Sequence, residues 1–124
     1  MRNRFLMPKA IFAFFILSNI VIVHVTGESA MQFVKDKKAV MIIASNNFRD
    51  EELLKPREVL EKNGVAVTVA SSSLKEATGM LGAKVKPDIL FSDINVADYD
   101  TVIFVGGSGA NEYWDNPTAH KIAN

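Results

Sequence analysis

Residues 39–56 read AVMIIASNNFRDEELLKP, an apolar run followed at once by a cluster of acids and a proline. An apolar run without alternation is typical of a strand that is covered on both faces, so we predict a parallel strand over 39–44. The acids that follow suit the first turn of a helix, whose amino end favours negative charge. The stretch therefore predicts a strand that runs into a helix, which is the first half of a βαβ unit.

Strand and helix signals alternate through the rest of the chain. The helix predicted over 50–63 has an apolar stripe and is followed by Gly64, a residue that suits a helix end. Apolar, β-branched runs predict two further parallel strands, over 65–70 and 101–105. Residues 76–94 are punctuated by glycine and proline, and they predict an antiparallel hairpin or an irregular excursion.

A last helix is predicted from Asn116 and Pro117, which suit the cap and the first position of a helix. Three parallel strands that alternate with helices form a three-layer α/β domain with a mostly parallel sheet. Helices are still missing from one face of this sheet, so we expect the domain to be incomplete at its C-terminus.

The N-terminal residues differ from the rest in composition. Residues 1–27 contain three basic residues and no acid, and they include the apolar run 10–25, AIFAFFILSNIVIVHV. This pattern predicts a secretory signal peptide; an uncleaved membrane anchor is the alternative, although the run falls short of the about 20 apolar residues that a bilayer needs. We therefore expect an exported protein, periplasmic or extracellular, or an anchored one, with a linker over 28–37 and one domain over 38–124.

Charge and cysteine content exclude several functions. The chain has 14 basic and 14 acidic residues, and three of the basic ones lie in 1–27, so the remainder has 11 basic residues against 14 acids. This mildly acidic balance argues against nucleic acid as a partner, and a membrane contact is expected only through the N-terminal segment. The chain has no cysteine and only one histidine after residue 27, so we expect no metal site.

Gly106 and Gly107 follow the strand predicted over 101–105, at the sheet edge where open α/β folds bind ligands. Glycine lets backbone N–H groups approach a ligand closely, so the pair indicates an oxyanion or anion site. A tight strand-to-helix turn is the plainer alternative. The dinucleotide fingerprint fails because Glu112 stands where it needs a glycine, and no P-loop is present, so we expect no cofactor.

Glu52 lies in the first helical turn, close to the same edge. Pro56 cannot donate an N–H group to the carbonyl of Glu52, so we predict that the helix bends or loosens there. A carboxylate aimed into a crevice between two loops would be partly removed from water and able to hold a proton; a solvated first-turn acid is the alternative. Asp50 or Asn47 is expected to cap the helix.

In their order and spacing, the segments AVMIIASNNFRDEELLKPREVLEKNGVAVTVAS, ATGMLGAKVKPDILFSDI and DYDTVIFVGGSGANEYWDNPTAHKIA resemble the first half of the ThiJ/PfpI superfamily, which includes PfpI-type peptidases and the parkinsonism-associated deglycase. The resemblance implies a flavodoxin-like sandwich, similar to class I glutamine amidotransferases, with a nucleophilic cysteine on a strand-to-helix elbow. It implies that Glu52, four residues before Pro56, meets that thiol. It also implies that backbone N–H groups of Gly106 and Gly107 form part of an oxyanion hole, while Asp50 and Glu51 serve the helix locally.

In the superfamily the cysteine elbow follows the helix that here begins near Pro117, so the resemblance implies that this chain stops just before it. The expected function is that of the N-terminal portion of an exported cysteine-dependent hydrolase, a peptidase or a glyoxalase/deglycase, which is catalytically incomplete here. A non-catalytic, chaperone-like or interaction module of the same fold is the alternative. The expected partners are a small carbonyl compound or peptide as substrate and a second copy of the chain in a homodimer.

Overall fold

The computed structural model describes residues 33–124. The signal peptide or anchor predicted over 1–27 and the first part of the linker predicted over 28–37 lie outside these residues. Within the described part of the chain, no helix has the length and apolar character needed to cross a membrane.

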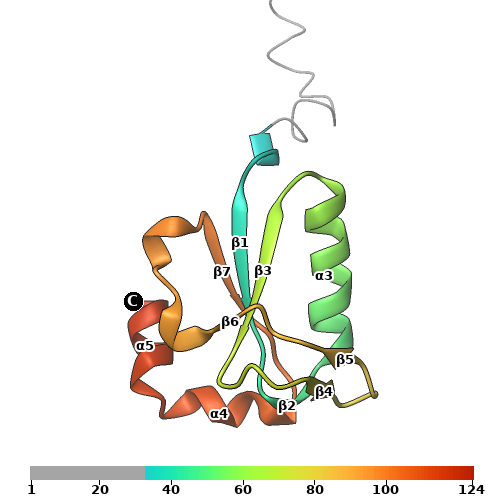
Figure 1. Ribbon diagram of the computed structural model, residues 1–124, viewed down its shortest axis with the longest axis vertical. Helices are drawn as coiled ribbons and strands as arrows, with labels where there is room; N and C mark the ends of the chain where they lie inside the picture. Colours follow the sequence, from blue (N-terminus) through green and yellow to red (C-terminus); the bar gives the residue numbers. More distant parts are fainter. Residues whose placement is uncertain (1–32) are drawn as a thin grey trace, which may run out of the picture. The chain divides into compact units, whose positions relative to one another are not determined.

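A four-stranded parallel sheet forms the centre of the fold (Figure 1). Its strands lie in the order β6-β3-β1-β7, and their bounds are β1 (Lys38–Ile42), β3 (Ala66–Ser71), β6 (Ile89–Leu90) and β7 (Thr101–Phe104). The three predicted parallel strands are confirmed, with ends that differ by one or two residues. The fourth, β6, was not predicted, because two residues are too few to show a period.

The central strand β1 explains the unbroken apolar run in the sequence. It pairs with β3 on one side and β7 on the other, and residues 39–44 are all buried. The core contains these residues together with side chains from the surrounding strands, loops and helices. Outside residues 39–44, the largest fully buried hydrophobic ones are Phe48, Leu53, Val69 and Val105.

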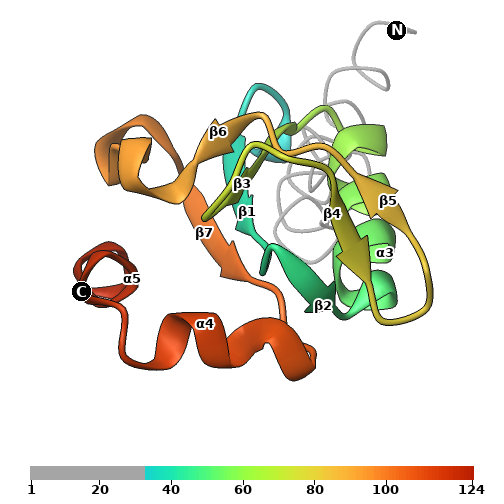
Figure 2. The ribbon, with the colours of Figure 1, turned by 60° about the horizontal axis from the view of Figure 1, so that its bottom comes forward.

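A second, smaller sheet lies beyond the end of β1. It consists of β2 (Asn46–Phe48), β4 (Ala77–Gly79) and β5 (Lys84–Val85). The pairing of β4 with β5 is antiparallel, which confirms the predicted hairpin, and β4 also pairs with β2 in parallel. The hairpin lies beside the first turn of the long helix α3 (Asp50–Lys62) (Figure 2).

The helix α3 covers one face of the sheet, and shorter helices cover the other. It continues without interruption through Pro56 and buries Leu53, so the proline does not end it. Gly64 follows with φ +83°, as predicted for the residue after a helix end. The other helices are η1 (Phe91–Asp93), η2 (Val96–Asp98), η3 (Ser108–Ala110), α4 (Asn111–Trp114) and α5 (Pro117–Ala123).

The two predicted helix caps have different outcomes. Asn116 caps α5 as predicted, because its side chain accepts hydrogen bonds from the N–H groups of Thr118 and Ala119. The prediction for α3 was wrong: Arg49 is the N-cap residue, and its side chain makes no capping hydrogen bond. Asn47 lies in β2, and the carboxylate of Asp50 is engaged elsewhere.

Candidate active site

The candidate site lies where the strand order of the main sheet reverses. If the strands are numbered by their order in the chain, they lie across the sheet as third, second, first, fourth. The chain connections therefore lead away in opposite directions from the boundary between β1 and β7. In open α/β sheets, ligands bind in the crevice that such a reversal opens at the carboxyl ends of the strands. The loop after β1 and the glycine turn after β7 border this position.

The structure brings Glu52 and Gly106 together at this edge. The N–H group of Gly106 donates a hydrogen bond to Glu52 Oε2 at 2.8 Å, and the N–H group of Arg49 donates to the Gly106 carbonyl at 2.7 Å. The Glu52 side chain is exposed, so the expected removal from water is not observed in residues 33–124. The structure thus shows the contact between Glu52 and Gly106, and the catalytic role of Glu52 stays a prediction.

Gly107 occupies a backbone conformation that side chains disfavour. Its φ is +113°, and a Cβ atom there would lie 2.5 Å from the Asn47 carbonyl oxygen and 2.6 Å from the Arg49 nitrogen. The turn therefore requires glycine, both for its backbone angle and for its close approach to the loop after β1. Within residues 33–124, the Gly107 N–H group donates to no acceptor, whereas that of Gly106 is engaged by Glu52.

A second carboxylate, that of Glu112, ties the loop after β1 to α4. Glu112 Oε2 accepts hydrogen bonds from both the N–H and the hydroxyl group of Ser45, each at 3.0 Å. Its other oxygen, Oε1, is buried and has no hydrogen-bond partner in the described part of the chain. This contact was not predicted from the sequence, because Ser45 and Glu112 are 67 residues apart and no local pattern links them.

Tyr113 follows Glu112 in the chain and is buried. Its ring meets that of Phe104 edge-on, with the ring centroids 5.6 Å apart. Burial raises the pKa of the Tyr113 hydroxyl, and the nearby charge of Glu112 adds to the effect. Tyr113 therefore serves packing, whereas its neighbour Trp114 is largely exposed.

Asp50 does not cap α3, as was predicted from the sequence, but binds the β4–β5 hairpin. Its carboxylate accepts hydrogen bonds from the N–H groups of Leu81 at 2.8 Å and Ala83 at 2.7 Å, and it packs against Gly79. Burial alone would raise the pKa of Asp50, but these N–H donors outweigh it, and the pKa lies below its ordinary value. Asp50 thus holds the turn of the β4–β5 hairpin against α3. Glu51, by contrast, pairs locally with Arg49 as expected, at 3.0 Å.

Apolar hollows lie on both faces of the sheet next to β7. One, of about 600 Å³, is lined by Ile103 of β7 together with Glu52, Pro56, Val59 and Leu60 of α3. The other, of about 330 Å³, is lined by Phe104 and Gly106 together with residues of α4 and α5, including Trp114 and His120. Among residues 33–124, β7 pairs in the main sheet only with β1, so its other edge is open to this part of the chain.

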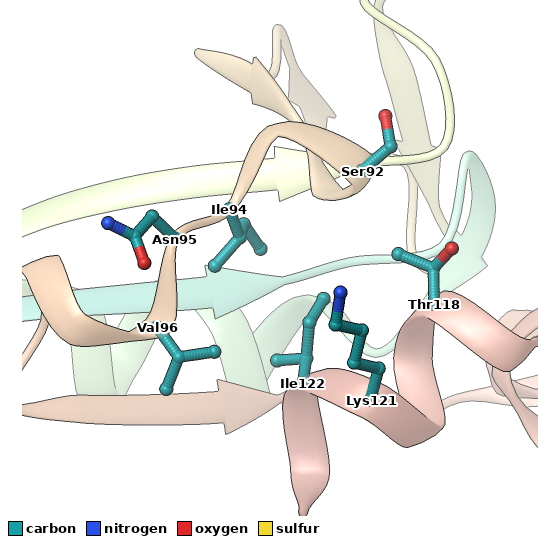
Figure 3. A pocket seen from close by; sticks show the side chains of 7 residues that line it. All are labelled: Ser92, Ile94, Asn95, Val96, Thr118, Lys121 and Ile122. Carbon is teal, nitrogen blue, oxygen red and sulfur yellow. The ribbon is translucent and has the colours of Figure 1, made fainter.

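A third hollow, of about 500 Å³, lies between the η1–η2 segment and α5 (Figure 3). Ile94, Val96 and Ile122 supply its apolar lining, and Lys121 supplies its cation. None of the predicted site residues lines it. His120, on the same helix, is exposed, and its Nε2 atom lies 2.6 Å from the Trp114 carbonyl oxygen. Within residues 33–124, no cluster of three potential metal ligands occurs.

Comparison with known proteins identifies the family. The model of the DJ-1/PfpI family matches residues 37–124, and the chain therefore belongs to the DJ-1/PfpI family. The predicted resemblance to the ThiJ/PfpI superfamily is thereby confirmed, as is the flavodoxin-like α/β fold.

Relatives of known sequence and structure agree with this placement. An uncharacterized protein of Methanocaldococcus jannaschii is 44% identical over 84 residues, which cover 67% of this chain and 41% of the relative. Deglycase PfpI of Pyrococcus furiosus is 31% identical over 84 residues, which cover 68% of this chain and 51% of that protein. The crystal structure of a ThiJ/PfpI domain protein from Brachyspira murdochii is similar with a TM-score of 0.68 and 31% identity, over 72% of this chain and 51% of that one. The chain thus spans about half the length of the relatives that it matches.

Proposed function

We propose that residues 37–124 supply the carboxylate and the backbone donors of a cysteine-dependent hydrolase that acts on reactive aldehydes. In this proposal the thiolate comes from polypeptide beyond Asn124 and attacks the substrate carbonyl. Glu52 holds or exchanges a proton with the thiol, and the Gly107 N–H group stabilises the oxyanion that develops. The deglycase names of three Pyrococcus relatives favour aldehyde chemistry over peptide hydrolysis.

The observation that carries the proposal is the hydrogen bond from Gly106 to Glu52. The N–H group of Gly107 lies beside it and has no acceptor within residues 33–124. An acid and a backbone donor that meet at the carboxyl edge of a parallel sheet can serve the proton and the oxygen of one carbonyl reaction. Glu52 lies exposed at this edge of the sheet, and further chain that covered the edge would enclose its carboxylate.

The open edge of β7 supports the same proposal. An unpaired strand edge with an apolar hollow on either face is suited to receive another strand and its covering helices. In a sheet ordered third, second, first, fourth, the next strand in the chain commonly lies beside the fourth. The carboxyl end of such a strand would emerge next to Gly106, where a nucleophile is needed. The expected export of the protein, which rests on residues 1–27, is part of this proposal.

The coding DNA beyond the codon for Asn124 gives the first test. An in-frame continuation that encodes an apolar strand followed by a cysteine supports the enzyme. A stop codon at that position would instead favour the non-catalytic interaction module.

The second test replaces the acid in the complete gene product. We expect Glu52→Gln to lower kcat/KM for methylglyoxal by about 100-fold or more, because a positioned acid or base contributes that much to proton transfer. Glu51→Gln, on the same helical turn, is the matched control, because Glu51 pairs with Arg49 and should leave turnover almost unchanged. Equal activity of the Glu52→Gln variant and the wild type would remove Glu52 from the mechanism.

A further inference from the structure

The turn of the β4–β5 hairpin is fixed beside the candidate site. Asp50 accepts hydrogen bonds from the N–H groups of Leu81 and Ala83, at 2.8 and 2.7 Å. The N–H group of Met80 donates to the carbonyl of Phe48, the last residue of β2, at 2.9 Å. The backbone of Met80 is therefore anchored to one of the two segments that border the candidate site.

The side chain of Met80 reaches the other loop. The N–H group of Ser108 lies 3.4 Å from Met80 Sδ, and Ser108 directly follows Gly107. Met80 thus contacts both segments that border the candidate site, with its backbone on β2 and its sulfur on the glycine turn. The free N–H group of Gly107 is one residue away from that contact.

Met80 is nevertheless 43% exposed, and Leu81 on the same turn is 65% exposed. A thioether is a weak hydrogen-bond acceptor, so its contact with Ser108 adds little binding energy of its own. Its chain is unbranched and polarizable, and such a side chain adapts to apolar groups of varied shape. Ligand sites are lined mostly by apolar side chains around a few polar groups, and Glu52 and Gly107 already supply the polar ones.

We propose that Met80 forms an apolar wall of the substrate site and that the enzyme prefers carbonyl substrates with a bulky apolar substituent beside the reacting carbonyl. This inference rests on the proposed function and adds a substrate class to it. Asp50 acts as the positioning residue, because it holds the hairpin turn that presents Met80. The wall selects by the apolar area that it covers and takes no part in proton transfer.

The test compares two aldehydes, methylglyoxal and tert-butylglyoxal, which share the reacting groups and differ in the size of the apolar substituent. In the complete gene product, Met80→Gln keeps the length of the side chain and removes its apolar end. We expect the ratio of kcat/KM for tert-butylglyoxal to that for methylglyoxal to fall about tenfold, since a lost apolar contact changes discrimination by that order. Met80→Leu, which stays apolar, should retain most of the wild-type ratio.

Leu74→Ala is the matched control, because Leu74 is an exposed apolar residue on the preceding loop, with no hydrogen bond to the glycine turn. It should leave the ratio as in the wild type. An active Met80→Gln variant with the wild-type ratio of the two kcat/KM values would contradict the role of Met80 as a wall of the substrate site. It would leave the proposed function intact. A wild-type enzyme that turns over neither aldehyde would overturn both.

Discussion

Gly107 illustrates how a single residue depends on its surroundings. It combines φ +113° with backbone atoms of the neighbouring loop within 3 Å of where a Cβ atom would lie. Gly82, in the hairpin turn, has a similar φ of +96°, but nothing lies within 4 Å of its Cβ position. Substitutions at these two glycines can therefore separate the loss of stability caused by backbone strain from the loss caused by a steric clash.

We expect Gly107→Ala to lower the melting temperature of the complete gene product clearly more than Gly82→Ala. Both variants pay for an unfavourable backbone angle, of the order of 1–3 kcal/mol, but only Gly107→Ala also pushes the glycine turn away from Asn47 and Arg49. Thermal unfolding followed by circular dichroism measures both. Equal melting temperatures for the two variants would show that the glycine turn can move away from the loop after β1 without further loss of stability.

The sequence predicts the meeting of Glu52 and Gly106 because each follows a parallel strand, and parallel strands end at one edge. It does not predict the partners of Asp50, which lie 31 and 33 residues downstream in a turn. In the sequence, an acid at the start of a helix gives the same pattern whether its side chain caps the helix or binds another segment. Sequence patterns therefore identify residues at strand ends, while side-chain contacts between loops come from the structure.

At the scale of elements, the contact between α3 and the β4–β5 hairpin depends on the charge of Asp50. The pKa of Asp50 is lower in the folded protein than its ordinary value, so the carboxylate stabilises the fold above the ordinary pKa of an aspartate. This stabilisation is lost as the pH falls through the lowered pKa. The hairpin should therefore loosen in acid, and Met80 with it.

We expect Asp50→Asn to be less stable than the wild type at pH 7. The two N–H donors reach different carboxylate oxygens, and the amide replaces one of these oxygens with an NH2 group that cannot accept, so one donor is left without a partner. Its free energy of unfolding should also fall less between pH 7 and about pH 3 than that of the wild type. Urea unfolding across this range measures both effects. Asp93→Asn, at an exposed position on η1, is the control, and identical pH profiles for the Asp50 and Asp93 variants would contradict the assignment.

The predicted elements agree with the structure where they are long and regular. β1, α3 and β3 were predicted within one or two residues of their ends, because their apolar patterns extend over several residues. β6 has only two residues and α4 only four, too few for a period to appear. Their place in the fold is set by pairing with β3 and by packing near β7, contacts that no local pattern reveals.

At the scale of the whole molecule, the open edge of β7 determines how residues 28–124 should behave alone. We expect them to unfold gradually with temperature, because fewer than about 100 residues with two uncovered apolar hollows bury little surface. The complete gene product should unfold in one cooperative transition. Differential scanning calorimetry of both proteins measures this, and a sharp transition from residues 28–124 alone would contradict the proposal that further chain completes the sheet.

The central position of β1 has a consequence for synthesis on the ribosome. Ile42 pairs with Phe104, and residue 104 lies 62 positions after residue 42. At about 5–20 residues per second, a nascent chain emerges with its most apolar strand lacking one neighbour for about 3–12 s. A chaperone that binds apolar segments at the exit tunnel would meet residues 39–44 during this interval, and crosslinking to ribosome-bound chains of increasing length would record that contact until β7 has emerged.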